Sequence, residues 1–154
     1  MPKVKAIPDG YPQLTPYICV DRAAEAIEFY KNVFGMKERM RMPAPGGKIG
    51  HAELQIGSSV QMLSDEHPEF GAVSPRTLGG TPATLSLYVE DVDGVFRKAI
   101  AAGAREVRPV RDEFYGDRSG QLEDPFGHKW NVATHVEDVS PEEMQRRAGA
   151  LATT

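Results

Sequence analysis

Residues 15–35, TPYICVDRAAEAIEFYKNVFG, and residues 84–103, TLSLYVEDVDGVFRKAIAAG, have the pattern of one structural unit written twice. Each begins with a short alternating run typical of a β-strand and continues with an apolar stripe at the i, i+3, i+4, i+7 spacing of an amphipathic helix. The stripes lie 69 positions apart: Ala23, Ala26, Ile27 and Tyr30 in the first, and Val92, Val95, Phe96 and Ala99 in the second. The sequence therefore predicts two copies of a strand followed by a helix.

Signals for the ends of both helices stand at matching places. Asp21 precedes the first helix and Asp91 the second, and an aspartate there can cap a helix N-terminus. Gly35 and Gly103 follow the last helical turns, where glycine commonly ends a helix. We expect Asp21 and Asp91 to be the N-caps.

Three further strands are expected after each helix, which predicts the order β-α-β-β-β twice. The strand-like runs are KERMRMP, KIGHAELQI and SVQMLSD in the first half, and AREVRPV, FYGDRSGQLE and HKWNVATH in the second. We divide the chain into modules at 11–64 and 83–137, a long connection at 65–82 and a C-terminal helical tail at 138–154, all within one domain of residues 1–154. In the last strands we align Gly57 and Gln61 with Gly127 and Asn131, a shift of 70.

Composition and charge exclude several classes of function. The 154 residues carry a net charge of −4 with scattered Lys and Arg, so no basic stripe for nucleic acid is present. No apolar run is long enough to span a bilayer, and the start MPKVKAIPDGYP does not resemble a signal peptide. Cys19 is the only cysteine and cannot form an intrachain disulfide. We expect a cytoplasmic protein with neither nucleic-acid nor membrane partners.

The ordered set of TPYICVDRAAEAIEFYKNVFGMKE, HAELQIGSSVQMLSDE and FYGDRSGQLEDPFGHKW resembles the vicinal oxygen chelate superfamily, which includes glyoxalase I, bleomycin resistance proteins and extradiol dioxygenases. The resemblance covers about residues 11 to 137 and is closest to the PhnB-like branch. It implies an α+β fold in which two βαβββ modules form a cup for a small molecule. Because each sheet is open and its edges need pairing, we also expect a homodimer.

The resemblance places Thr15 and Thr84 at the first-strand positions where metal-dependent members carry His. It places Gln61 and Asn131 at the last-strand positions where those members carry Glu or a similar ligand. All four residues are neutral, whereas divalent transition metals are held by imidazole, thiolate or carboxylate. We therefore expect no metal and no other cofactor. The four residues could instead bind a ligand by hydrogen bonds, or could simply be polar positions beside water.

His51 and Glu53 lie two apart on one strand face, where they could act as a base and its orienting carboxylate or as ligands of a relocated metal. A solvated rim of the cup is the alternative. Ser86 and Tyr88 alternate with apolar residues and should face the cup. Tyr115, Asp117 and Arg118 could position a polar or anionic substrate, or could only build a turn. Asp65 and Glu66 are expected in a solvated loop, and Trp130 in the core.

Three functions follow from these patterns. The first is a metal-free pocket for a small molecule, working by sequestration or by side-chain acid/base chemistry. The second is a metal-dependent isomerase, lyase or dioxygenase with ligands away from the usual quartet, His51 and Glu53 foremost. The third is a scaffold or regulatory dimer whose cup is filled by its own side chains. The identity of the ligand does not follow from the fold.

Overall fold

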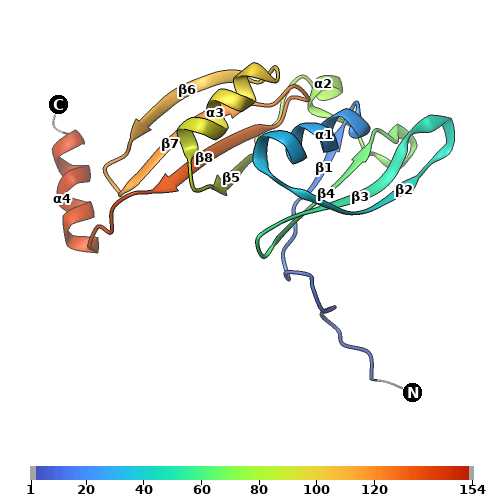
Figure 1. The fold of residues 1–154 in the computed structure, drawn as a ribbon, viewed down its shortest axis with the longest axis horizontal. Helices are drawn as coiled ribbons and strands as arrows, with labels where there is room; N and C mark the ends of the chain where they lie inside the picture. Colours follow the sequence, from blue (N-terminus) through green and yellow to red (C-terminus); the bar gives the residue numbers. More distant parts are fainter. Residues whose placement is uncertain (1–2, 153–154) are drawn as a thin grey trace. The chain divides into compact units, whose positions relative to one another are not determined.

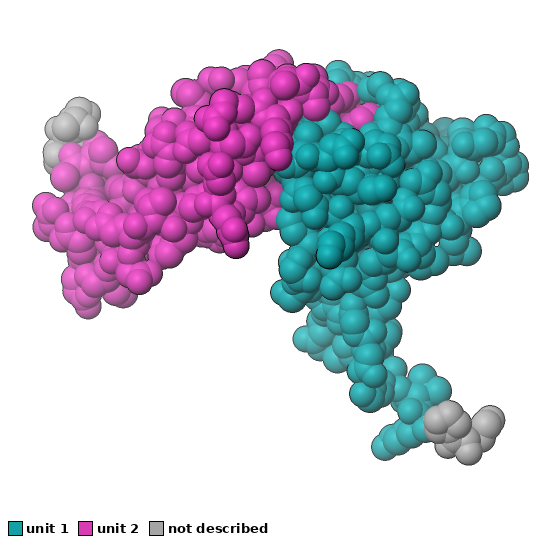
Figure 2. Space-filling model, in the orientation of Figure 1, with its two compact units in different colours: residues 1–80 teal, residues 81–154 magenta. Residues whose placement is uncertain are grey.

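The computed structural model describes residues 3–152 and divides the chain into two compact units, which meet in the sequence between Gly80 and Thr81 (Figure 2). The first unit contains the strands and helices β1 (Tyr17–Val20), α1 (Ala23–Phe34), β2 (Lys37–Pro43), η1 (Pro45–Gly47), β3 (Ile49–Ile56), β4 (Ser59–Asp65), η2 (Pro68–Phe70) and α2 (Pro75–Leu78). The second contains β5 (Thr84–Tyr88), α3 (Val92–Ala101), β6 (Arg105–Asp112), β7 (Asp117–Glu123), β8 (Lys129–His135) and α4 (Pro141–Ala152).

Each unit is built around a four-stranded mixed sheet with the same topology. The strand orders are β1-β4-β3-β2 and β5-β8-β7-β6, and in each sheet the first strand runs parallel to its neighbour while the other pairs are antiparallel. Figure 1 shows α1 across the first sheet and α3 across the second. The predicted βαβββ duplication is confirmed, and the observed strands differ from the predicted runs mainly at their first residues.

The core of each unit lies between the helix and one face of the sheet. In the first unit the apolar stripe of α1 is fully buried, together with alternate residues of the strands: Val20, Ala23, Ala26, Ile27, Tyr30, Ala52, Leu54 and Leu63. In the second unit the same layer contains Val92, Phe96, Ala99, Leu122, Trp130 and Val132. Burying side chains of this size is the main stabilising term for such a fold. The prediction that Trp130 is a core residue is confirmed, and its indole nitrogen donates to Asp124 at 2.9 Å.

The repeat keeps a shift of 69 through the last strands, so the alignment at 70 is wrong there. Tyr17 pairs with Met62 in the first sheet, and Ser86 pairs with Asn131 in the second. Met62 is therefore the counterpart of Asn131. The shared glycine was misleading because β3 and β4 are joined by residues 57–58, whereas β7 and β8 are joined by the longer turn 124–128.

This correction moves Gln61 to the other face of its sheet. Directly opposed residues of an antiparallel pair share a face, and Gln61 opposes Leu54 while Leu63 opposes Ala52. Gln61 therefore lies on the side of the sheet that α1 covers. Its amide nitrogen donates to the backbone carbonyls of Met62 at 2.8 Å and Pro16 at 3.4 Å. A slip of one residue in alignment reverses the face of every side chain in a strand.

The last strand of each unit caps the helix that follows the first strand. Asp65 accepts from the backbone N–H of Ala23 at 2.8 Å, and Thr134 accepts from that of Val92 at 2.9 Å. These two pairs again differ by 69. Asp91 also caps α3 as predicted, by accepting from Gly94. The prediction for Asp21 is wrong, because Arg22 occupies the N-cap position of α1 and makes no side-chain capping bond.

The connection after β4 is structured, and the expectation that Asp65 and Glu66 are in a solvated loop is wrong. Asp65 is buried and accepts from Ile49 N–H at 2.7 Å as well as from α1. Glu66 accepts from the Ser74 and Thr77 hydroxyls at 2.6 and 2.8 Å, and these hydrogen bonds lower the pKa of Glu66. The two carboxylates anchor β4 and α2 within the first unit.

The tail forms the predicted helix α4, which the Ser140 hydroxyl caps by accepting from Glu143 N–H. Arg147 attaches α4 to the second unit through Glu137 at 2.8 Å and the carbonyl of Phe114 at 3.1 Å. Within residues 3–152, no helix is both long enough and apolar enough to cross a membrane.

Candidate functional site

The face of each sheet that lies opposite its helix is called here its open face. On the first sheet, strand pairing places Tyr17, Met62 and Glu53 on this face, and alternation adds His51. Pairing with β2 adds Met40, opposite Glu53, and Met42, opposite His51. The face thus gathers one imidazole, one carboxylate, one phenol and three thioethers.

A continuous hydrogen-bonded chain runs across this open face. The Tyr17 hydroxyl lies 2.9 Å from His51 Nδ1, and His51 Nε2 lies 2.8 Å from Glu53 Oε2. The Tyr11 hydroxyl donates to the other carboxylate oxygen of Glu53 at 2.7 Å. Arg39 lies over the Tyr11 ring, 4.5 Å from its centroid, and donates to the Gly10 carbonyl. The segment before β1 is therefore held against the predicted pair.

Glu53 is ionised in this arrangement although it is only 4% exposed. Burial acts to raise the pKa of Glu53, but the hydrogen bonds from His51 and Tyr11 outweigh it and lower the pKa overall. The bond to Glu53 in turn raises the pKa of the Tyr11 hydroxyl. A carboxylate can only accept, so a neutral His51 carries its hydrogen on Nε2 and presents the lone pair of Nδ1 to Tyr17.

This geometry has the elements of a general base. A carboxylate fixes the tautomer and orientation of an imidazole, and the opposite nitrogen accepts from a hydroxyl at the protein surface. The surroundings are apolar and accessible, since Tyr17 and Met42 are each 52% exposed and Met40 is 37% exposed. Methionine side chains adapt to varied apolar shapes, which suits the walls of a binding site.

The open face of the second sheet carries a different cluster. Asp117, which is buried, accepts from the Tyr88 hydroxyl at 2.6 Å and bonds His135 Nδ1 at 2.8 Å. His135 Nε2 bonds the exposed Asp138 at 2.7 Å. The bonds to Asp117 and Asp138 raise the pKa of His135, and the bond to Asp117 raises the pKa of Tyr88. Both nitrogens of His135 face carboxylates, so this ring is a hydrogen-bond donor on both sides when it is protonated.

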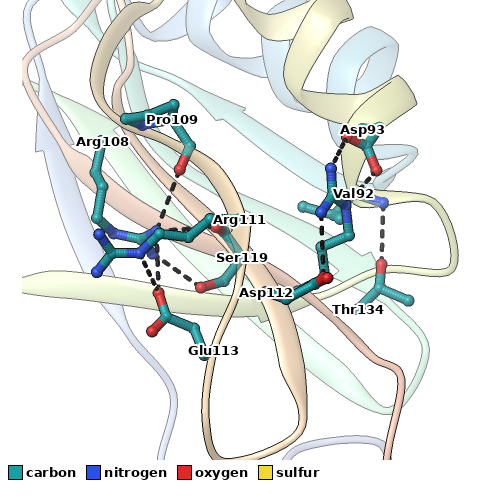
Figure 3. Close-up of polar contacts among 10 residues, drawn as sticks. Val92, Asp93, Arg108, Pro109, Arg111, Asp112, Glu113, Ser119 and Thr134 are labelled. Atoms are coloured by element: carbon teal, nitrogen blue, oxygen red, sulfur yellow. Dashed lines mark hydrogen bonds and ion pairs between the residues drawn. The ribbon is translucent and has the colours of Figure 1, made fainter. Parts of the chain in front are cut away.

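Arg108 lies on the same open face and is held in place by four polar partners (Figure 3). It donates to the Ser119 hydroxyl at 2.8 Å, the Ser119 carbonyl at 3.0 Å and the Pro109 carbonyl at 3.2 Å. Glu113 pairs with both Arg108 at 3.1 Å and Arg111 at 2.8 Å. Arg108, Arg111 and Glu113 together carry a net charge of +1.

Several predicted ligand-binding residues lie on the open face of the second sheet. Thr84, Ser86 and Tyr88 alternate along β5 on this face, and Asn131 pairs with Ser86. Thr15 lies just before β1, and its hydroxyl donates to the Pro12 carbonyl at 3.5 Å. Tyr115 lies in the turn before β7, where its ring packs edge-on against Phe114.

Arg118 is on the opposite face, which corrects its predicted place in the cup. It donates to Asp93 at the start of α3 at 2.8 and 3.0 Å and to Asp112 at 3.1 Å. Figure 3 shows Asp93 beside Val92 at the N-terminus of α3, and Asp112 below it. The reason is alternation: Asp117 points to the open face, so the next residue points to the helix.

The residues at the usual metal positions do not fit a divalent transition metal. Thr15, Thr84, Asn131 and either Gln61 or its register neighbour Met62 offer neither imidazole nor carboxylate. Gln61, moreover, lies on the α1 side. His51 and Glu53, the residues suggested as ligands of a relocated metal, are also engaged. Both His51 nitrogens and both Glu53 oxygens already have hydrogen-bond partners. Within residues 3–152, no three His, Cys, Asp or Glu side chains are arranged to hold a metal ion.

Sequence reasoning missed Tyr11 and Arg108 as members of these clusters. Tyr11 precedes the first recognisable strand and reaches Glu53 from 42 residues away, so no local pattern indicates it. Strand alternation could have indicated Arg108, which pairs with Gln121 on the open face. The bulges around Arg108 interrupt the period of β6 and obscure that signal.

Comparison with known proteins agrees with this architecture. An uncharacterized protein of Mycobacterium tuberculosis H37Rv is 43% identical over 137 residues, which are 87% of this chain and 81% of that protein. Among solved structures, TioX from Micromonospora sp. ML1 is 29% identical with a TM-score of 0.64, covering 81% of this chain and 99% of its own. The protein PA1353 from Pseudomonas aeruginosa is 25% identical with a TM-score of 0.68, covering 82% and 99%.

A PhnB protein from Bacillus cereus, described as a putative 3-demethylubiquinone-9 3-methyltransferase, has the same fold with a TM-score of 0.61 at 19% identity, covering 80% of this chain and 99% of its own. The family model of the Glyoxalase/Bleomycin resistance protein/Dioxygenase superfamily matches residues 11–132. Sequence, topology and fold thus lead to one conclusion: the chain belongs to the glyoxalase/bleomycin resistance protein/dioxygenase superfamily.

Proposed function

We propose that this protein binds a small organic molecule through side-chain hydrogen bonds, without a resident metal, at the open face of its first sheet. The observation that carries the proposal is the chain of hydrogen bonds from Tyr17 through His51 to the buried carboxylate of Glu53. Burying an ionised carboxylate is costly unless it is well bonded, and both oxygens of Glu53 are bonded, one by His51 and the other by Tyr11.

The same arrangement supports acid/base chemistry as an extension of binding. His51 Nδ1 is the acceptor end of the chain, and Glu53 stabilises the imidazolium that would form if His51 took a proton. Sequestration of a ligand and proton transfer from it therefore use the same residues. A metal-dependent isomerase, lyase or dioxygenase is the second candidate, and the donor set described above argues against it.

The branch, assembly and location of the protein also belong to the proposal. The likeness to the Bacillus PhnB protein supports a PhnB-like branch, and open sheet edges support a homodimer. A cytoplasmic location accords with the single cysteine. A scaffold role with a self-filled site is opposed by the exposure of Tyr17, Met40 and Met42.

Native mass spectrometry of the protein purified from its producing cells tests the proposal. We expect a retained organic mass in the wild type that is lost in His51→Ala and kept in Tyr88→Phe, which removes a phenol hydroxyl from the open face of the second sheet. Loss of the mass in Tyr88→Phe alone would move the site to the second sheet. A protein that carries no organic mass and binds none from an extract of the same cells would contradict the proposal.

A further inference from the structure

The acceptor nitrogen of His51, Nδ1, is hydrogen-bonded to the phenol group of Tyr17. The Tyr17 hydroxyl lies 2.9 Å from Nδ1, and its ring packs against the imidazole with centroids 5.4 Å apart at an interplanar angle of 37°. Tyr17 is on β1, an edge strand, and half of its surface is exposed. The contact is therefore made by a side chain that can move away without disturbing the core.

The side chains that pair with His51 and Glu53 across β2 and β3 are apolar. Met42 opposes His51 across the β2 and β3 pair, and Met40 opposes Glu53. An aromatic ring placed there would lie on thioether groups, which make favourable contacts with ring edges. Both arginines of β2 already have partners, because Arg39 donates to the Gly10 carbonyl and Arg41 pairs with Glu38 at 2.6 Å. Neither is therefore available to bind an anion beside His51. An anion is thus a poorer match than a neutral hydroxyl.

From this geometry we infer that the ligand is a phenol or a related hydroxyaromatic compound, whose hydroxyl replaces that of Tyr17 on His51 Nδ1. The inference rests on the proposed function and specifies the class of molecule it binds. Tyr17 acts as an internal stand-in that satisfies His51 when the site holds no ligand and that competes with the ligand for the same acceptor. Glu53 is a positioning residue, because it keeps the hydrogen of His51 on Nε2.

The test uses para-cresol, which is the side chain of tyrosine as a free molecule, and para-methylanisole, which has the same ring but no hydroxyl donor. Both are titrated by NMR at mildly alkaline pH, where imidazole is neutral and a phenol is still protonated. We expect Tyr17→Phe, which frees Nδ1, to bind para-cresol about three- to tenfold more tightly than the wild type does, the effect of one hydrogen bond. The double variant Tyr17→Phe, His51→Ala should lose this gain.

Two controls separate the hydrogen bond from packing. Tyr88→Phe removes a hydroxyl that donates to a buried carboxylate on the open face of the second sheet, and it should leave the affinity for para-cresol unchanged. Para-methylanisole should gain nothing from Tyr17→Phe. Equal affinity of the wild type and Tyr17→Phe for para-cresol, or an equal gain for para-methylanisole, would overturn the inference. If native mass spectrometry still finds a ligand lost with His51→Ala, only the phenol class fails and the proposed function stands.

Discussion

At the scale of single residues, the site depends on how the buried Glu53 is kept ionised. The pair His51 and Glu53 was predictable because a strand places residues two apart on the same side, and the 2.8 Å contact confirms their proximity. The partners at either end, Tyr11 and Tyr17, come from the chain before and within β1. Their part depends on a parallel pairing between β1 and β4 whose register no local pattern specifies.

Glu53→Gln should destabilise the protein in a manner that depends on pH. A carboxyl with a lowered pKa stabilises the fold above its ordinary pKa of about 4.3, and this contribution is lost as the pH falls through the lowered value. We expect the variant to lose about 1–3 kcal/mol of unfolding free energy at neutral pH. Urea denaturation across the acid range should show the gap closing below about pH 4. A gap of constant size would contradict an ionised Glu53.

At the scale of elements, patterns within one segment were predictable and relations between segments were not. The stripes of α1 and α3 and the alternation of β2 and β4 specify their bounds almost to the residue. The caps supplied by Asp65 and Thr134 could not be foreseen, because each joins the last strand to a helix 42 residues earlier. The predicted position of Gln61 was wrong for a similar reason. The turn between β3 and β4 is shorter than the turn between β7 and β8, which conceals the true register of the repeat.

Asp65→Ala and Thr134→Val should each weaken the unit that contains them. Removing a side-chain cap costs about 0.5–2 kcal/mol of unfolding free energy, and Asp65 should be at the upper end because it also accepts from Ile49. Asp21→Ala is the matched control, since Asp21 makes no capping bond, and should change stability by less than about 0.5 kcal/mol. Chemical denaturation of the three variants measures this. Asp21→Ala as the most damaging change would refute the assignment of the caps.

At the scale of the whole molecule, each sheet has one edge that is protected and one that is not. The edge strands β2 and β6 are rich in charged residues and contain Pro43 and Pro109, which discourage pairing with another chain. The opposite edge strands, β1 and β5, have the sequences YICV and TLSLY, with no charge and no proline. Strands of this kind usually pair or are covered.

We therefore expect a homodimer in solution, stabilised through the β1 and β5 edges. Sedimentation velocity at micromolar concentration should give about twice the mass of one chain. Placing a lysine at an exposed position of β5, as in Thr84→Lys, should weaken the dimer, whereas Val107→Lys at an exposed position of the protected strand β6 should not. A monomer at every concentration, or equal effects of the two variants, would argue against this assembly.

Elemental analysis distinguishes a ligand that is held by side chains from one that is held by a metal. The protein is purified without chelators from cells supplied with zinc, nickel, manganese and iron, and its metal content is measured by mass spectrometry beside that of His51→Ala and Asn131→Ala. We expect far less than about one transition metal per chain in all three proteins, because the donors do not match any of these ions. About one tightly held metal per wild-type chain, absent from either variant, would contradict it.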